Sequence, residues 1–247
     1  MPELKRSYIG CSGYHYSAWK GPFYPDDIPK KDWLGYYAER FNSVEINNSF
    51  YKVPDPETFE SWKDQTPATF RFTLKGSRYI THMKKLKDPE KHLKKFYDAI
   101  EPLGDKTRCI LWQLPGNLHE NTEKLDHFCS KLSQDYTNVL EFRHQSWFSG
   151  KVGEIISGAR KCVICSLSAP GDLPEDLFVD RGITYVRFHG KDDWYRHDYS
   201  DGELEKWAEK IAGSGTRELY AYFNNDVDAH APVNAQTFRE KMEKNSN

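Results

Sequence analysis

The sequence of 247 residues contains only five cysteines, odd in number and scattered along the chain. Cys162 and Cys165 have the CxxC spacing, but residues i and i+3 of a strand face opposite sides, so this pair is poorly placed to share a metal ion. This pattern does not favour a disulfide framework. We expect buried, reduced thiols, which are typical of a reducing compartment.

Long apolar runs are also missing. No stretch approaches the roughly 20 apolar residues of a membrane-spanning helix, and the charged segment from Met1 to Ser7 lacks the apolar core of a signal peptide. We therefore expect a cytoplasmic protein without a membrane partner. The formal net charge is only −2, so no overall field attracts the chain to nucleic acid or to an anionic membrane.

Cofactor motifs are absent as well. Gly10-Cys11-Ser12-Gly13 is too short to be a dinucleotide-binding fingerprint, and we find no nucleotide, flavin or haem motif. Aromatic residues, in contrast, are abundant, with 7 Trp, 15 Tyr and 14 Phe. Each buried aromatic side chain removes about 150–250 Å² from water, so the chain can build a sizeable core although only 38% of its residues are hydrophobic.

Eight short apolar segments alternate with amphipathic helical patterns. The predicted strands are Tyr8–Cys11, Ser43–Asn47, Phe70–Lys75, Cys109–Gln113, Val139–Arg143, Cys162–Ser166, Thr184–His189 and Leu219–Asn224. Between them, apolar residues recur with helical spacing, as in Trp33, Leu34 and Tyr37. Ser200 and Glu203 form a capping box that predicts a helix start.

Strands that alternate with helices form right-handed βαβ units and a parallel sheet. Eight repeats favour closure into a (β/α)8 TIM-like barrel over an open doubly wound sheet, and the length fits such a barrel. We predict one domain over residues 1–247, with flexible ends at residues 1–6 and 243–247. The connections after the strands are long, for example from Ser12 to Ile28, and barrels carry their sites on that side.

Polar residues recur near the C-terminal ends of the predicted strands. They are Glu45, Asn47, Lys75, Gln113, Glu141, Arg143, Arg187, His189 and Asn224. A charged side chain beside bulky hydrophobes must be paired or functional, because burying it alone costs several kcal/mol or more. We therefore predict a site at the C-terminal mouth of the barrel.

A series of motifs resembles the YecE-like family of uncharacterised proteins, domain of unknown function 72. The motifs include Ile9-Gly10-Cys11-Ser12-Gly13-Tyr14, Glu45-Ile46-Asn47, Gln113-Leu114-Pro115, Glu141-Phe142-Arg143-His144, Arg187-Phe188-His189-Gly190 and Tyr222-Phe223-Asn224-Asn225-Asp226. The resemblance covers nearly the whole chain, in order. It implies a TIM-like barrel and no particular activity.

The strand-end residues favour a hydrolase-like enzyme that acts on a phosphorylated or nucleic-acid substrate. Arginine suits bidentate binding of phosphate or carboxylate, and histidine can act as acid or base near neutral pH. The catalytic candidates are Glu45, Glu141, His144, Arg187 and His189. The candidates for substrate binding are Tyr14, Trp19, Asn47, Lys75, Arg78, His82, Gln113, Arg143, Trp147, Asn224 and Asn225. We expect a small anionic or phosphorylated ligand.

A basic segment from Arg71 to Lys95 favours an anionic partner. Its cations are Arg71, Lys75, Arg78, Lys84, Lys85, Lys87, Lys91, Lys94 and Lys95. With Tyr79 and His82 interleaved, the loop after the third strand could hold a nucleic-acid backbone. The alternative is a solvated helix face, since Lys91, Lys94 and Lys95 lie off the apolar stripe.

Three other interpretations remain open. Glu45 and Glu141 could be the acid and base of a carbohydrate-active barrel if their carboxyl groups lie roughly 5–9.5 Å apart. They could instead form a structural ion network with Arg143 and Arg187. The chain could also be a non-catalytic module that binds a nucleic acid or a small anion.

A divalent metal is a further possibility. Glu45, Glu141, His144 and His189 are the candidate ligands, and carboxylates and imidazoles from successive strands are the ligand types of barrel metalloenzymes such as abasic-site endonucleases and sugar isomerases. Arg143 and Arg187 at neighbouring strand ends argue against it, because a guanidinium repels a cation. Asp226, after the last strand, is expected to cap the helix that follows.

Overall fold

The structure is a computed structural model that describes residues 3–245. Over these residues it contains eight parallel strands: β1 Arg6–Cys11, β2 Ser43–Ile46, β3 Arg71–Lys75, β4 Thr107–Gln113, β5 Thr137–Glu141, β6 Cys162–Ser168, β7 Ile183–Phe188 and β8 Glu218–Phe223. The α-helices are α1 Trp33–Ala38, α2 Asn48–Tyr51, α3 Pro56–Asp64, α4 Glu90–Ile100, α5 Thr122–Lys131, α6 Gly150–Gly158, α7 Asp201–Ala212 and α8 His230–Asn245.

The strand order in the sheet is β1-β8-β7-β6-β5-β4-β3-β2. With its alternating helices, this is the (β/α)8 TIM-like barrel that the sequence predicts. Each predicted strand is present, with ends that differ by a residue or two. Because of these differences, four predicted strand-end residues lie just after their strands: Asn47, Arg143, His189 and Asn224.

The chain divides into two compact units. The terminal unit combines the residues up to Glu45 with those from Ser166 onward, and the central unit is Ile46–Cys165. Both boundaries fall inside strands, β2 and β6, so neither is a linker. The two units are described separately below.

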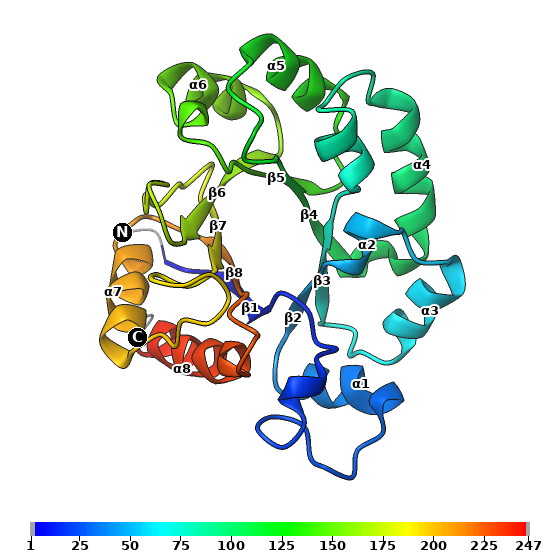
Figure 1. The fold of residues 1–247 in the computed structure, drawn as a ribbon, viewed down its shortest axis with the longest axis vertical. Helices are drawn as coiled ribbons and strands as arrows, with labels where there is room; N and C mark the ends of the chain where they lie inside the picture. The colour runs from blue at the N-terminus through cyan, green and yellow to red at the C-terminus, as the bar shows by residue number, and fades with distance from the viewer. Residues whose placement is uncertain (1–2, 246–247) are drawn as a thin grey trace. The chain divides into compact units, whose positions relative to one another are not determined.

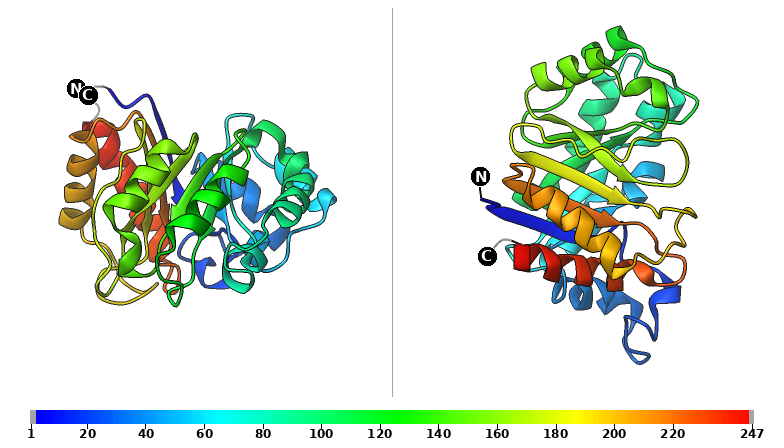
Figure 2. Two further views of the ribbon diagram at one scale, coloured as in Figure 1. Left: turned by 90° about the horizontal axis from the view of Figure 1, so that it is seen from above. Right: turned by 90° about the vertical axis from the view of Figure 1, so that its left-hand side faces the viewer.

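In the terminal unit, β8 is flanked by β1 and β7. The registers run from Arg6↔Glu218 to Cys11↔Phe223 and from Ile183↔Glu218 to Phe188↔Phe223, and one further bridge joins Ser12 to Glu45. The helices α7 and α8 pack side by side, and α8 also covers β1 and β8 (Figures 1 and 2). Phe188 stacks on Phe223 at 4.3 Å between ring centroids, and both rings pack against Phe238 of α8, which connects the ladder to this helical layer.

In the central unit, β4 lies between β3 and β5, and β5 also pairs with β6. Helices α5 and α6 are neighbours outside this ladder (Figure 1). Trp112 is fully buried between Phe96 of α4 and Phe128 of α5, with ring centroids 5.5 and 5.4 Å away. Gly76 follows β3 against this ring, and a Cβ there would lie 2.2 Å from the indole. Glycine is therefore required at that position.

Two smaller predictions are confirmed. All five cysteines are free and buried. The capping box is present: the Ser200 side chain accepts from the Glu203 backbone N–H, and the Glu203 carboxylate accepts from the Ser200 backbone. No helix within residues 3–245 is long and apolar enough to cross a membrane.

Parts of both chain ends lie in regular elements. Arg6 already belongs to β1, because Lys5 and Arg6 both donate to the Arg217 carbonyl, and residues 243–245 continue α8. Residues 1–2 and 246–247, also expected to be flexible, lie outside the described residues.

Candidate functional site

In the terminal unit, Glu45 is the centre of a buried hydrogen-bond network. Its side chain is fully buried. One carboxylate oxygen pairs with Arg187 at 2.5 Å and accepts from the Ser12 hydroxyl, and the other accepts from the Tyr185 hydroxyl. Arg187, only 1% exposed, also donates to Ser12 at 2.9 Å. The carboxylate is thus neutralised and fully engaged, which favours the structural ion network as its role.

His189 follows β7 beside this network and is completely buried. Arg187 lies within 3.3 Å of its Nε2, and the side-chain amide of Asn224 lies 3.0 Å from its Nδ1. Asn225 is placed differently, because its amide donates to the His197 carbonyl and to the Asn234 side chain. These hydrogen bonds hold the loop after β8.

In the central unit, cations gather around His82 at the ends of β3 and β5. Burial lowers the pKa of His82 to about 4, and the charges of Lys75, Arg78 and Arg143 act in the same direction. The charge of Glu141 acts in the opposite direction and raises this pKa. The ring packs on Phe50 at 5.0 Å, and its Nδ1 lies 2.9 Å from the Thr81 hydroxyl. This imidazole is therefore neutral at pH 7 in a positive field.

Glu141 ends β5 and is fully buried. Its carboxylate accepts a hydrogen bond from Nε of Arg143, two residues later in the chain. This is the pairing expected for a structural ion network. Gln113 lies directly opposite Glu141 in the register between β4 and β5. The central unit therefore brings Lys75, Arg78, His82, Gln113, Glu141 and Arg143 to the C-terminal ends of β3, β4 and β5.

His144 has a structural role in the same region. Its Nδ1 accepts from the Ser146 backbone N–H at 3.2 Å and so caps the short helix Gln145–Trp147. The ring stacks on the exposed His119, with centroids 3.9 Å apart. One ring nitrogen of His144 is thus used to cap this short helix.

The aromatic candidates are largely part of the core. Trp19 and Trp147 are buried, and their indole N–H groups donate to the carbonyls of Asp226 and Leu118. Neither offers a free face for stacking on a substrate. Tyr14 and Asn47 are half-buried; Tyr14 lies beside Tyr37 at 6.4 Å.

Metal ligands do not gather in the described part of either unit. Within the described residues, no group of three or more His, Cys, Asp or Glu side chains could hold a metal ion. Of the candidate ligands, Glu45 and Glu141 pair with arginines, and His144 uses its Nδ1 as a helix cap.

Three residues of these networks were missed in the sequence. Ser12 and Tyr185 both donate to Glu45, and His119 stacks on His144. Tyr185 could have been found, because it shares a strand face with Arg187 two residues later. Asp226 was expected to cap the following helix; that helix, α8, begins four residues later at His230, and burial raises the pKa of the Asp226 carboxyl.

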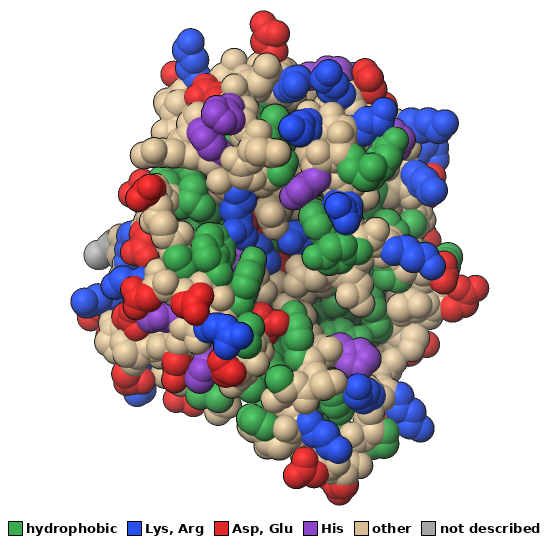
Figure 3. All heavy atoms as spheres, in the orientation of Figure 1, with side chains coloured by type: hydrophobic (Ala, Val, Ile, Leu, Met, Phe, Trp, Pro, Cys, Tyr) green, Lys and Arg blue, Asp and Glu red, His purple; other side chains and the backbone are tan. Residues whose placement is uncertain are grey.

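A groove in the central unit adjoins the basic segment. Its volume is about 610 Å³, and its walls include Lys52, Tyr79, His92 and Lys95. The Tyr79 ring is 38% exposed and lies 4.7 Å from His92. Several Lys and Arg side chains gather beside α4 on the face shown in Figure 3.

Comparison with known sequences identifies the family. The profile described as "Protein of unknown function DUF72" matches residues 8–247. The chain belongs to this family. It is 26% identical to the UPF0759 protein YunF of Bacillus subtilis, over 96% of this chain and 94% of that protein. It is also 31% identical to the UPF0759 protein YecE of Escherichia coli, over 46% and 42% of the two chains.

Solved structures agree with this assignment. A DUF72 family protein from Thermotoga maritima superimposes with a TM-score of 0.83 and 28% identity, covering 96% of this chain and 99% of that one. A DUF72 protein from Enterococcus faecalis, with a TM-score of 0.79 at 18% identity over 96% and 95% of the two chains, shows the same fold. The expected family and barrel are therefore confirmed, and the family's description assigns no activity.

Proposed function

We propose that the protein is a hydrolase-like enzyme that acts on a phosphate-bearing substrate at the C-terminal ends of β3 and β5. The observation that carries this proposal is the gathering of three cations, Lys75, Arg78 and Arg143, around His82, where their charges add to burial in lowering its pKa. Groups that disfavour a proton on an imidazole favour an anion beside it. Lysine and arginine together are the usual ligands of a phosphoryl group.

The chemistry follows from the same four side chains. The cations would stabilise the charge of the phosphoryl group during transfer, and the neutral His82 imidazole can accept the proton of an attacking water. A bound phosphate dianion would offset the cations and raise the pKa of His82 towards its ordinary value of about 6.5. Substrate binding would then make His82 a better base.

The carbohydrate alternative is weaker. It requires one carboxyl group that can donate a proton and another that can act as base or nucleophile. Glu45 and Glu141 are instead both paired with arginines, so neither carboxyl group is left free to act on a glycosidic bond.

The groove lined by Tyr79 bears on the size of the substrate. Ser77, Tyr79 and Ile80 line it, and Arg78 of the same segment acts on His82. An exposed tyrosine beside lysines suits stacking of a nucleobase, so oligonucleotides belong among the substrates to be tested. Lys94 pairs with Asp98 at 2.6 Å, so part of the basic segment is a solvated helix face.

The test compares Arg78→Ala with Arg160→Ala, an exposed arginine in the same unit. The His82 NMR signals report phosphate binding, and p-nitrophenyl phosphate, its diester and a short single-stranded oligonucleotide report turnover. Loss of one charge-assisted hydrogen bond, about 1.5–3 kcal/mol, should weaken binding roughly tenfold or more in Arg78→Ala and leave Arg160→Ala unchanged.

Two results would contradict the proposal. If no phosphate-bearing compound binds to the wild-type protein, or if Arg78→Ala binds as tightly as the wild type, the cations do not form a phosphate site. Binding that depends on Arg78 but comes with no turnover of any of the three compounds would instead identify the non-catalytic binding module.

A further inference from the structure

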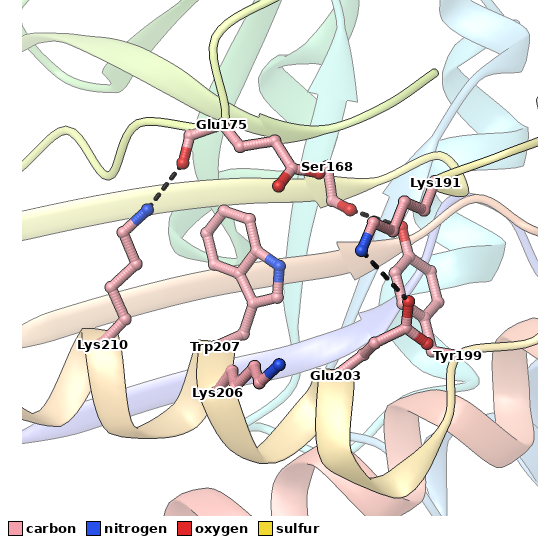
Figure 4. A pocket seen from close by; sticks show the side chains of 8 residues that line it. All are labelled: Ser168, Glu175, Lys191, Tyr199, Glu203, Lys206, Trp207 and Lys210. Carbon is pink, nitrogen blue, oxygen red and sulfur yellow. Dashed lines mark hydrogen bonds and ion pairs between the residues drawn. The ribbon is translucent and has the colours of Figure 1, made fainter. Parts of the chain in front are cut away.

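A second cavity lies entirely in the terminal unit, beside α7 and the segments that follow β6 and β7. Its volume is about 190 Å³. Figure 4 shows its lining, in which Trp207 of α7 stands between Lys210 on one side and Lys191 and Tyr199 on the other. None of the strand-end residues described above lines it.

The Trp207 side chain has an unused donor that faces this cavity. The residue is only 8% exposed, and its ring packs edge-on against Phe188 at 5.4 Å. Nowhere in the described part of the chain does its indole N–H find a hydrogen-bond acceptor, and Figure 4 shows the indole nitrogen directed towards Lys191 and Tyr199. The indole N–H is therefore free to donate to an acceptor that a ligand brings into the cavity.

The charges around Trp207 favour an acceptor that is negative. Lys206 also lines the cavity, and no described residue forms an ion pair or hydrogen bond with its ammonium group. Lys210 lies 4.9 Å from the indole centroid and donates to the backbone carbonyl of Glu175, not to its carboxylate.

The carboxylate of Glu203 is already engaged. It accepts from the backbone and the hydroxyl of Ser200 at 2.9 and 2.8 Å, and it lies 3.9 Å from Lys191. Three ammonium groups therefore face two carboxylates across the lining, and one of those carboxylates is used as a helix cap. The net charge of the cavity lining is therefore positive.

We infer that this cavity binds the oxyanion group of a small metabolite, a phosphate or a carboxylate, through the Trp207 indole N–H and the Lys206 ammonium group. The volume is smaller than the roughly 300–1,000 Å³ of pockets for drug-sized ligands, so the ligand is small. This site is separate from the cations around His82 and does not depend on the function proposed for them.

The far wall of the cavity is connected to His189. The Tyr199 hydroxyl donates to the Ser168 side chain at 2.8 Å and accepts from the Gly190 backbone N–H at 2.9 Å. The His189 backbone N–H donates to the Ser168 carbonyl at 2.8 Å. An anion that contacts Ser168 or Tyr199 would therefore alter the hydrogen bonds that hold His189.

The experiment follows the indole N–H signals of the ¹⁵N-labelled full chain, with the Trp207 signal assigned from Trp207→Phe. Sodium phosphate and sodium succinate are titrated separately. In each titration the backbone amide signal of His189 is recorded together with the indole signals. We expect a saturable shift of the Trp207 signal with at least one anion; the anion that acts distinguishes a phosphorylated ligand from a carboxylate. Lys206→Gln should weaken this binding about tenfold or more.

Lys244→Gln is the matched control, because it removes the same charge from an exposed position on α8. It should bind the anion with wild-type affinity. The inference is overturned if neither anion shifts the Trp207 signal, or if Lys206→Gln binds as tightly as Lys244→Gln. The His82 signals in the same spectra report the other site, so failure here leaves the proposed function standing and the converse also holds.

Discussion

The buried pair of Glu45 and Arg187 gives the sharpest test of how the terminal unit is built. Glu45→Gln keeps the shape of the side chain but removes the carboxylate charge that pairs with the guanidinium of Arg187, which is 1% exposed. Removing one partner of a buried ion pair costs about 3–5 kcal/mol. Total stabilities are about 5–15 kcal/mol, so this single change should remove a large part of the free energy of unfolding.

Urea denaturation followed by circular dichroism measures this loss. Glu39→Gln is the matched control, because Glu39 pairs with Arg40 at 3.3 Å but its side chain is 74% exposed. Exposed pairs contribute about 0–1 kcal/mol, so the control should unfold at nearly the wild-type urea concentration.

The double variant Glu45→Gln, Arg187→Met tests the cause. If the cost comes from the unpaired guanidinium, removing it should restore much of the stability, because apolar replacement of a buried pair is often close to neutral. The two substitutions would then be non-additive by about 2 kcal/mol or more, within the range seen for residues in contact. A Glu45→Gln variant as stable as Glu39→Gln would refute the reasoning and reopen a catalytic role for Glu45.

Three other predictions follow from the structure. His82 should titrate by NMR with a pKa of about 4; because the unfolded chain binds this proton more readily, stability should fall as the pH drops from about 6.5 to 4, and His82→Asn should flatten that part of the urea profile. A normal titration near pH 6.5 would contradict the positive field. Ser200→Ala should lower the free energy of unfolding by about 1 kcal/mol, because it removes the side-chain cap on the Glu203 N–H. An unchanged urea midpoint would show that this cap does not stabilise the protein. Gly76→Ala should cost about 1–3 kcal/mol in the same assay, since the new Cβ would meet Trp112 at 2.2 Å; a neutral effect would mean that the indole moves aside.

The pattern of the sequence was sufficient for the fold. Strand positions follow from apolar runs such as the one that ends at Gln113, and the start of α7 follows from Ser200 and Glu203. These signals are local: each depends on residues within a few positions of one another. The elements that these signals predict are retained in the folded protein, because alternating strands and helices have few ways to bury their apolar faces.

The roles of the polar residues could be decided only by the tertiary structure. That Glu45 lies against Arg187, 142 positions away, or that the cations at the ends of β3 and β5 lower the pKa of His82, depends on distances between segments far apart in the chain. Residue types alone allowed His144 and His82 the same chemistry, and packing made one a helix cap and the other a neutral imidazole among cations. The physical reason is that charges and hydrogen bonds act through space over a few ångströms, between residues that can be far apart in the sequence. The hydrophobic pattern that determines the fold depends instead on residues close together in the sequence.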